Sequence, residues 1–528
     1  IESVEISLLV VDEAHCISEW GHNFRPDYLK LPVYRQALNI DTVLLLTATA
    51  TNQVRQDMAD KFAIKAEHIV KTGFYRENLQ LAVQAVPSEE KLSRLLNAVR
   101  QQCGAGIVYV TLQKTAEQVA TWLKAQQVNA QAYHAGLGNE RRQQIQEDFM
   151  ADKVPVIVAT IAFGMGIDKA NIGFVIHYDL PKSIEGYSQE IGRAGRDGAP
   201  AFCLTLANLD GLTTVENFIY GDTPELAAIR HVLADIEQGY QQGRWELQLL
   251  SLANASNIRQ LTLKTLLVQL ELLGVIKPLY AYFSEVKIKL LKAEAEILAQ
   301  FDHHRQVFLR TVLRHVQFKR VWGQVDFTGL LAELNGQRDR VIAALDYLQL
   351  QGLIELETKS LTEVFQVQLA ELKQEGLASS LTDYFSDKEV KDIARLTELV
   401  GFFQLDSCLS YYLADYFGDD SAPQSCGHCS VCQGSIAKLS YSKSFTWPSD
   451  EQLINALQLL QQHLASRTAQ PLSVETACRF LAGIHMPLFT RAKVRNLAGY
   501  GICEQFSYQE SRDKVTALWS VIFPDNVR

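Results

Sequence analysis

The chain has 528 residues, of which 47% are hydrophobic and 21% are charged, and its formal net charge at pH 7 is −10. At roughly 150 residues per domain, this length predicts about three or four domains. The balanced composition excludes a collagen-like or broadly disordered chain, and no apolar run approaches the ~20 residues of a membrane span. The acidic balance excludes a protein that binds phosphates over its whole surface, so any contact with nucleic acid must come from local patches.

The first two hundred residues alternate short apolar runs with longer amphipathic stretches. The apolar runs fall at residues 7–11, 43–46, 107–110, 156–159 and 174–177. This alternation predicts βαβ units with parallel sheets, which place their ligand-binding residues after the strands. From about Asn208 the pattern changes to long helices rich in Leu, Ala and Gln.

Adjacent carboxylates, Asp12 and Glu13, follow the first apolar run within the sequence Asp-Glu-Ala-His. In Mg²⁺–nucleotide chemistry one carboxylate holds the metal, and a second orients and deprotonates the attacking water. We expect Asp12 to take the first role and Glu13 the second. The sequence Thr-Ala-Thr-Ala-Thr at residues 47–51 follows the second apolar run.

A matching set of residues follows later strands. Residues 159–168 read ATIAFGMGID and residues 189–198 read QEIGRAGRDG. Arg193 and Arg196 are three apart, so we expect them on one helical face, from which they reach γ-phosphate oxygens across a cleft. A solvated basic helix end is the alternative for this pair.

Aromatic residues crowd the segment at residues 18–28, just after the acidic pair. Trp20, His22 and Phe24 offer ring faces on which bases can stack, and Arg25 offers a phosphate or base contact. The segment therefore predicts a single-stranded nucleic-acid contact. A purely structural role for these aromatic rings is the alternative.

Four of the nine cysteines are clustered: Cys408, Cys426, Cys429 and Cys432. The spacing C-x17-C-x2-C-x2-C is typical of a closed structural zinc site, with a helix at residues 409–417 returning the first cysteine to the others. His428 lies inside the cluster but is not expected to be a ligand, because four thiolates complete the site. Disulfides are the alternative, but a single cluster in a chain without an export signal indicates a reducing, cytoplasmic compartment, near the nucleoid if the source is bacterial.

Together these motifs resemble motifs II, III, V and VI of superfamily 2 helicases. The aromatic loop, the sequence YHAGL at residues 133–137, and the cysteine module with YFG at residues 416–418 are similar to the RecQ family. The resemblance implies an ATP-dependent 3′→5′ DNA helicase that acts in recombination and repair. Its cofactors would be ATP, Mg²⁺ and Zn²⁺, and its partners single-stranded DNA, duplex junctions, and single-strand-binding or repair proteins.

The resemblance also implies roles for individual residues. His15 would pair with Gln189 across the cleft between two RecA-like lobes and couple DNA binding to ATP hydrolysis. The residues implied at the nucleotide are Asp12, Gly166, Asp168, Arg193 and Arg196, and Thr160 joins Trp20, His22, Phe24 and Arg25 at the DNA.

The helical second half contains a weak internal repeat. With an offset of 78, Leu267, Leu270, Gly274 and Ile276 fall on Leu345, Leu348, Gly352 and Ile354. We expect each copy to be a winged helix, that is, a helix–turn–helix followed by a Gly-bounded hairpin; two unrelated helical hairpins are the alternative. The fold is thus predicted as multi-domain α/β: parallel-sheet lobes at residues 1–73 (incomplete) and 74–210, two winged-helix repeats within 211–400, a zinc module at 401–437, and a helical or winged-helix domain at 438–528, with a strand starting near Gly501.

Two features depart from the family. The chain has no G-x-x-x-x-G-K-[ST] loop, so we expect a fragment that binds ATP poorly and hydrolyses it negligibly. The repeats precede the zinc module, so the hairpin that splits the duplex would lie near residues 280–283 or 358–361. A non-catalytic DNA-binding regulator and a superfamily 2 RNA helicase are the competing functions.

Overall fold

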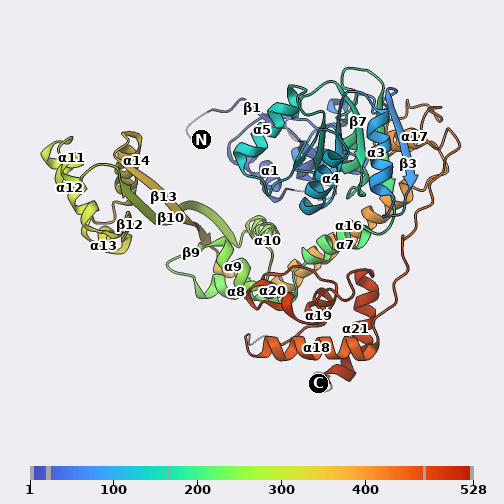
Figure 1. The fold of residues 1–528 in the computed structure, drawn as a ribbon. Helices are drawn as coiled ribbons and strands as arrows, with labels where there is room; N and C mark the ends of the chain where they lie inside the picture. Colours follow the sequence, from blue (N-terminus) through green and yellow to red (C-terminus); the bar gives the residue numbers. More distant parts are fainter. Residues whose placement is uncertain (1–4, 19–24, 165–166, 468–470, 524–528) are drawn as a thin grey trace. The chain divides into compact units, whose positions relative to one another are not determined.

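In the computed structural model, the chain forms two units (Figure 1). Unit 1 combines Ile1–Leu226 with Ser379–Arg528, and unit 2 is the intervening Ala227–Ala378. The structure describes residues 5–18, 25–164, 167–467 and 471–523. None of the helices in these ranges combines the length and the apolarity that crossing a membrane requires.

The first lobe of unit 1 is built on two parallel strands, β1 (Leu8–Val11) and β2 (Thr42–Leu45). Its helices are the 3-10 helices η1 (Ala14–Ile17), η2 (Pro26–Lys30) and η3 (Ala66–His68) and the α-helices α1 (Leu31–Ala37) and α2 (Asn52–Phe62). The inner face of the strand pair packs on α2 around Val11, Val54 and Phe62. Thr51 begins α2 by accepting a hydrogen bond from the Val54 amide, as an N-cap residue does.

The second lobe is a six-stranded, all-parallel sheet in the order β3-β8-β7-β4-β6-β5. Its strands are β3 (Leu79–Ala85), β4 (Ala105–Tyr109), β5 (Ala130–Tyr133), β6 (Val156–Ala159), β7 (Ile172–His177) and β8 (Ala201–Ala207). Its helices are α3 (Lys91–Gln101), α4 (Gln113–Ala125), α5 (Asn139–Met150), α6 (Ile184–Ile191) and α7 (Leu212–Gly221). Two buried clusters cover the sheet's two faces, which explains why its strands are continuously apolar. The predicted parallel-sheet lobes are confirmed.

Unit 2 contains a five-stranded antiparallel sheet in the order β11-β12-β10-β13-β9. Its strands are β9 (Arg244–Leu247), β10 (Ile276–Leu290), β11 (Val316–Lys319), β12 (Trp322–Val325) and β13 (Ile354–Val367). Its helices are α8 (Leu226–Gln238), α9 (Leu249–Ser256), α10 (Gln260–Leu272), α11 (Glu294–Leu298), α12 (His303–Arg314), α13 (Phe327–Glu333), α14 (Arg338–Leu350) and α15 (Leu369–Leu372).

The predicted internal repeat is real, but its pairing differs from the expectation. Helix α14 starts 78 residues after the start of α10, and β13 starts 78 residues after the start of β10. Gly274 and Gly352 come just after the two helices and have positive φ, as helix-ending glycines do. The expected local hairpin in each copy is wrong. β10 and β13 pair with each other along their lengths, from Ile276↔Val367 to Leu290↔Ile354. The two long strands form one ribbon, visible as the paired arrows of Figure 1.

The predicted duplex-splitting tips at residues 280–283 and 358–361 are therefore also wrong. Tyr282 pairs with Thr362 in the middle of the ribbon, so neither segment is a tip. The Tyr282 hydroxyl donates to Glu246, and the Arg338 guanidinium lies 4.5 Å from the centre of its ring. These contacts show that Tyr282 packs the ribbon against its own module.

The rest of unit 1 is helical. Helix α16 (Leu377–Phe402) leads to α17 (Leu409–Tyr416) and the cysteine module, and α18 (Asp450–Ala465), α19 (Val474–Leu481), α20 (Pro487–Arg491), η4 (Val494–Asn496) and α21 (Tyr508–Ile522) follow. The strand expected near Gly501 is wrong: in the described part of 438–528 there are only helices and turns. The Cys503 amide donates to the Leu481 carbonyl, which holds this segment as a turn against α19. The finer domain boundaries drawn from the sequence stay predictions.

Candidate active site and metal centre

The acidic pair lies at the carboxyl end of β1, where parallel sheets place their ligands. Glu13 has left-handed backbone angles (φ 49°), and its amide donates to the Asp12 carboxylate at 2.8 Å. The next amide, that of Ala14, donates to the Leu46 carbonyl at 2.9 Å. This bond ties the turn after β1 to the Thr-Ala-Thr segment after β2, so the two predicted motifs are brought together.

Glu13 and His15 share a partly buried environment. Burial first, and then the charge of Asp12, raise the pKa of Glu13 above its ordinary value, while Arg25 and Arg193 oppose the shift. His15 is buried, and its Nδ1 lies 3.3 Å from a Glu13 carboxylate oxygen and 2.9 Å from the Thr47 hydroxyl. A carboxylate of raised pKa beside a buried imidazole is suited to accept a proton from water.

The second lobe approaches this site through α6 and the turns that follow it. Ser183 caps the helix by accepting from the Gly186 amide at 3.1 Å. Near the other end of α6, the Gln189 side-chain amide donates to the Thr49 hydroxyl of the first lobe at 3.1 Å. The predicted His15–Gln189 pairing stays a prediction.

The two arginines lie in the turns after α6, so the prediction of a shared helical face is wrong. The helix ends at Ile191, and Gly195 continues the chain with φ 55°, which a helix does not allow. Arg193 donates to the Gly164 carbonyl, and a Cβ atom on Gly164 would lie 2.3 Å from the guanidinium. Arg196 donates to Asp168 at 3.2 Å. The glycine is therefore needed for the close approach of Arg193.

A cavity of about 290 Å³ unites most of the predicted catalytic residues. It is lined from the first lobe by Glu13, His15, Cys16 and Arg25, and from the second lobe by Gly164, Ile167, Asp168, Gln189, Arg193 and Arg196. Asp12 is exposed beside it. Folding thus places a proton acceptor and two guanidinium groups around one space, although they come from segments about 180 residues apart.

The predicted DNA-binding residues are placed only in part. Trp20, His22 and Phe24 lie outside the described residues, as does Gly166 of the nucleotide set. Arg25 lines the cavity, with its guanidinium 5.7 Å from the Tyr28 ring. Thr160 follows β6 but is only 8% exposed, and its amide donates to the Tyr133 carbonyl. Thr160 could therefore offer little of its side chain to a ligand in this conformation.

Two residues that the sequence analysis missed hold the arginine turn. Arg76 donates to the Gly195 carbonyl at 2.6 Å, and the Asn78 side-chain amide donates to the same oxygen at 2.8 Å. Both residues precede β3, which is adjacent to the turn only in the folded sheet. In the sequence, Arg76 and Asn78 are marked only by being polar residues just before a strand.

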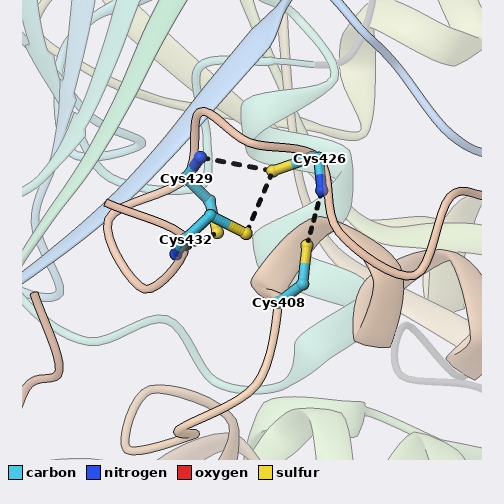
Figure 2. A group of neighbouring side chains, drawn as sticks. All are labelled: Cys408, Cys426, Cys429 and Cys432. Carbon is cyan, nitrogen blue, oxygen red and sulfur yellow. Dashed lines mark hydrogen bonds between the residues drawn. The ribbon is translucent and has the colours of Figure 1, made fainter. Parts of the chain in front are cut away.

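The four clustered cysteines face one another at the start of α17 and in the loop after it (Figure 2). All four sulfur atoms lie within 4.8 Å of one another, and those of Cys426 and Cys432 are 3.9 Å apart. A tetrahedral zinc ion with ~2.3 Å bonds requires about 3.8 Å between its sulfur ligands. Backbone amides point at the thiols: Cys426 N lies 3.3 Å from Cys408 Sγ and Cys429 N lies 3.2 Å from Cys426 Sγ. The donor set and its spacing fit zinc.

His428 lies beside this cluster but outside it. Its Nδ1 is 2.8 Å from the Cys426 carbonyl and its Nε2 is 3.2 Å from the Leu79 carbonyl, so both ring nitrogens face the backbone. All nine cysteines are free in the structure, and the sulfur atoms of Cys426 and Cys432 are 3.9 Å apart, a spacing that suits a shared metal ion and not a disulfide bond. The loop also covers the edge strand β3, since the Ser430 amide donates to Leu81 and its hydroxyl accepts from Val83.

Two parts of the chain match protein-family models. Residues 89–198 match the helicase conserved C-terminal domain, and residues 373–433 match the RecQ zinc-binding domain. The first match lies within the second lobe, from before α3 to the arginine turn, and the second includes the four cysteines.

Several curated proteins are similar to parts of this chain. An ATP-dependent DNA helicase Q5 of Rattus norvegicus is 46% identical over 213 residues, which is 38% of this chain and 22% of the relative. An ATP-dependent DNA helicase RecQ of Bacillus subtilis is 44% identical over 209 residues, 39% of this chain and 35% of the relative. An ATP-dependent DNA helicase Q-like 5 of Arabidopsis thaliana is 28% identical over 412 residues, 75% of this chain and 44% of the relative. The chain thus spans less than half the length of each of these relatives.

Proposed function

This chain belongs to the RecQ family of superfamily 2 helicases, and on that premise we propose that it carries the DNA-stimulated part of an ATP-dependent 3′→5′ DNA helicase. The observation that carries the proposal is the cavity that Glu13 shares with Arg193 and Arg196. A carboxylate base and two guanidinium groups facing one space are the arrangement that nucleotide hydrolysis needs.

In the proposed mechanism the side chains of the cavity act on the metal ion, the attacking water and the phosphate oxygens. Asp12, exposed at the end of β1, holds Mg²⁺, which supplies positive charge at the phosphates when it is bound. Glu13 accepts a proton from the attacking water, which its raised pKa favours. Arg193 and Arg196 donate to phosphate oxygens and stabilise the charge that develops on them. Asp168, at 3.2 Å from Arg196, orients that guanidinium.

The proposed motor step is the opening and closing of the two lobes. Gln189 of α6 donates to Thr49 of the first lobe, so this bond links α6 directly to the first lobe. Closure would bring the arginines onto the nucleotide and advance the DNA, and opening would reset the grip. The proposed DNA contacts are Arg25, Trp20, His22 and Phe24; the predicted contact of Thr160 would require a conformation that exposes its side chain.

The zinc module and unit 2 are proposed to support binding of single-stranded DNA and duplex junctions. The biological setting that we propose is recombination and repair of DNA in the cytoplasm, near the nucleoid if the source is bacterial, alongside single-strand-binding or repair proteins. This setting is supported by the family of the chain and by the names of its relatives as DNA helicases.

ATP turnover needs a loop that cradles the β- and γ-phosphates, and the 528 residues contain no G-x-x-x-x-G-K-[ST] sequence. The test therefore compares this chain with a longer form that extends upstream of Ile1, each assayed for ATP hydrolysis with and without single-stranded DNA. We expect DNA-stimulated turnover from the longer form alone. In that form, Arg196→Ala should lower kcat about a thousandfold, as loss of an arginine finger does.

Other outcomes identify the competing functions. If both forms bind DNA and neither hydrolyses ATP, the protein is a DNA-binding regulator. Stimulation by RNA in place of DNA would identify an RNA helicase. Unwinding of a duplex with a 5′ tail but not one with a 3′ tail would contradict the proposed polarity.

A further inference from the structure

The link between the two lobes is held by the segment that precedes the cysteine loop. The first lobe ends with η3 (Ala66–His68), and the second begins with β3 at Leu79. Between them, Phe74 stacks on Phe417 with ring centres 4.1 Å apart. Phe417 belongs to residues 416–421, here named the pivot segment, which runs from the last residue of α17 towards Cys426.

Within the pivot segment, Asp419 binds the interlobe link directly. One oxygen of its carboxylate accepts hydrogen bonds from the backbone amides of Phe74, at 2.6 Å, and Tyr75, at 2.9 Å. The other oxygen accepts from the amide and the hydroxyl of Ser421 at 3.0 and 2.6 Å. These bonds, that of the Ser421 hydroxyl first, lower the pKa of Asp419 to about 2, so the carboxylate is ionised throughout the neutral range. Asp419 is 9% exposed, so the bonds are shielded from water.

The same segment also binds the first lobe. Arg55, on α2, donates through one nitrogen to the Ala50 carbonyl and to the Phe417 carbonyl, each at 2.9 Å. Ala50 belongs to the Thr-Ala-Thr-Ala-Thr motif, whose Thr49 accepts from Gln189. Gly418 has φ 69°, and a Cβ atom there would lie 2.6 Å from the Arg55 guanidinium. Glycine is therefore required for this approach.

The second lobe is bound at the start of the segment. The Tyr416 hydroxyl donates to Glu185 at 2.8 Å, and Glu185 is 4% exposed in the first turn of α6. Helix α6 carries Gln189 and leads into the Arg193 turn. The pivot segment is therefore bonded to three parts that the proposed lobe motion must coordinate: the motif after β2, the interlobe link, and the helix that presents the arginines.

We propose that Asp419 is a positioning residue for lobe closure, and that the pivot segment is the fixed point about which the two lobes move. This inference rests on the proposed function, because it assigns the segment to the same ATP-driven motion. The metal ligands flank the segment, with Cys408 at the start of α17 and Cys426 after it. Zinc bound to them would fix both ends, so the module would set the geometry of the motor as well as stabilise its own loop.

The first test measures the contact itself, without ATP. Asp419→Asn keeps the size of the side chain but removes the charge that accepts two amide hydrogens. We expect hydrogen exchange of the Phe74 and Tyr75 amides to rise about tenfold or more, as expected on losing hydrogen bonds to a charged group. Asp415→Asn is the matched control, because Asp415 is an exposed aspartate of α17 just outside the pivot segment, and it should leave this exchange unchanged. Unchanged exchange in Asp419→Asn would overturn the inference.

The second test separates positioning from simple support. Spin labels introduced as unnatural amino acids at Glu67 and Lys153, whose side chains are 70% and 71% exposed, report the distance between the lobes. We expect one narrow distance distribution in the parent and in Asp415→Asn, and a broader one in Asp419→Asn at a temperature where all three are folded. An equally narrow distribution would show that Asp419 only stabilises the loop.

The third test uses the upstream-extended form in which the proposed function is tested. We expect Asp419→Asn to lower DNA-stimulated kcat about tenfold with little change in KM for ATP, because it alters closure and leaves the binding groups in place. If kcat is unchanged while the distance distribution broadens, the pivot is not part of the motor and the inference fails. If the parent itself shows no turnover, the proposed function fails, while the exchange and distance results still decide whether the pivot exists.

Discussion

Glu13 illustrates how a catalytic environment is made at the scale of one residue. Its backbone is left-handed, its side chain is half withdrawn from water, and Asp12 is its neighbour in sequence. The burial and the Asp12 charge disfavour the ionised carboxylate, and the more distant Arg25 and Arg193 favour it. The raised pKa that makes Glu13 a better proton acceptor therefore lowers the stability of the folded chain.

This cost gives a pH-dependent prediction. Below pH 4.5 the Glu13 carboxyl is protonated in both the folded and the unfolded chain; as pH rises through 4.5 and then through the raised folded pKa, ionisation lowers the free energy of unfolding. We therefore expect Glu13→Gln to raise the thermal midpoint at pH 7 and to have no such effect at pH 4. The gain should correspond to at most about 1 kcal/mol, because the side chain is 39% exposed and solvent screens it.

Thermal melts of the parent and the variant at the two pH values provide the measurement. Glu5→Gln, a change of the same kind at an exposed site, should leave the midpoint unchanged at both pH values. A gain of equal size at pH 4 and pH 7 would show that ionisation of Glu13 is not its cause.

At the scale of elements, the cysteine module acts as part of the second lobe. Cys429 is fully buried, and it shares a hydrophobic cluster with Ile107, Tyr187 and Phe402. Binding of a structural zinc ion contributes directly to folding, so without the ion the cysteine loop would no longer be fixed against this cluster.

We expect one zinc per chain in the parent and none in Cys429→Ser, with the melting midpoint lowered by more than about 5 °C. A chelator should lower the midpoint of the parent by a similar amount and have no further effect on the variant. Metal analysis and melts of the same samples check this, and Cys103→Ser, at an exposed free thiol, is the control. Retention of zinc by Cys429→Ser would mean that three thiolates suffice and that another group completes the site.

Local patterns predicted the individual elements well. The strand at 156–159 has the predicted bounds, and the offset of 78 aligns the starts of α10 with α14 and of β10 with β13. These features depend on periodicity and on helix-ending glycines, which are properties of adjacent residues.

Pairing and positioning could not be predicted in the same way. A lone strand such as β10 carries no mark of its partner, and it pairs with β13, which starts 78 residues later in the chain. Asp419 resembles any loop aspartate in sequence; its two bonds to the Phe74 and Tyr75 amides exist only after the lobes have folded. The position of Asp12 and Glu13 at the end of a strand, by contrast, was predictable because an apolar run directly precedes them in the sequence.

At the scale of the molecule, unit 2 interrupts unit 1, and the chain passes between them through α8 and α16. The C-terminal helices bind unit 1 next to both passages. Arg479 of α19 is 3% exposed and donates to Glu225 at 3.0 Å and to the Thr223 carbonyl, just before α8. Arg512 of α21 lies 3.7 Å from Glu389 of α16. The C-terminal helices therefore contact the two segments of unit 1 that precede and follow unit 2 in the chain.

A prediction follows for this buried ion pair. Arg479→Met keeps much of the volume but removes the charged donor of the Glu225 carboxylate, which keeps only the Thr476 hydroxyl, and the donor of the Tyr220 and Thr223 carbonyls. Removing one partner of a buried pair costs about 3–5 kcal/mol. We expect urea unfolding of the C-terminal module to shift accordingly, and limited proteolysis between Gly221 and Leu226 to become faster. Combining it with Glu225→Gln should cost less than the sum of the two single changes, because the removed charges are partners. Arg491→Met, at an exposed arginine on α20, should change the stability by no more than about 0.5 kcal/mol. If the stability losses of the two single changes add strictly in the double variant, or if proteolysis is unchanged in Arg479→Met, then this ion pair does not stabilise residues 221–226.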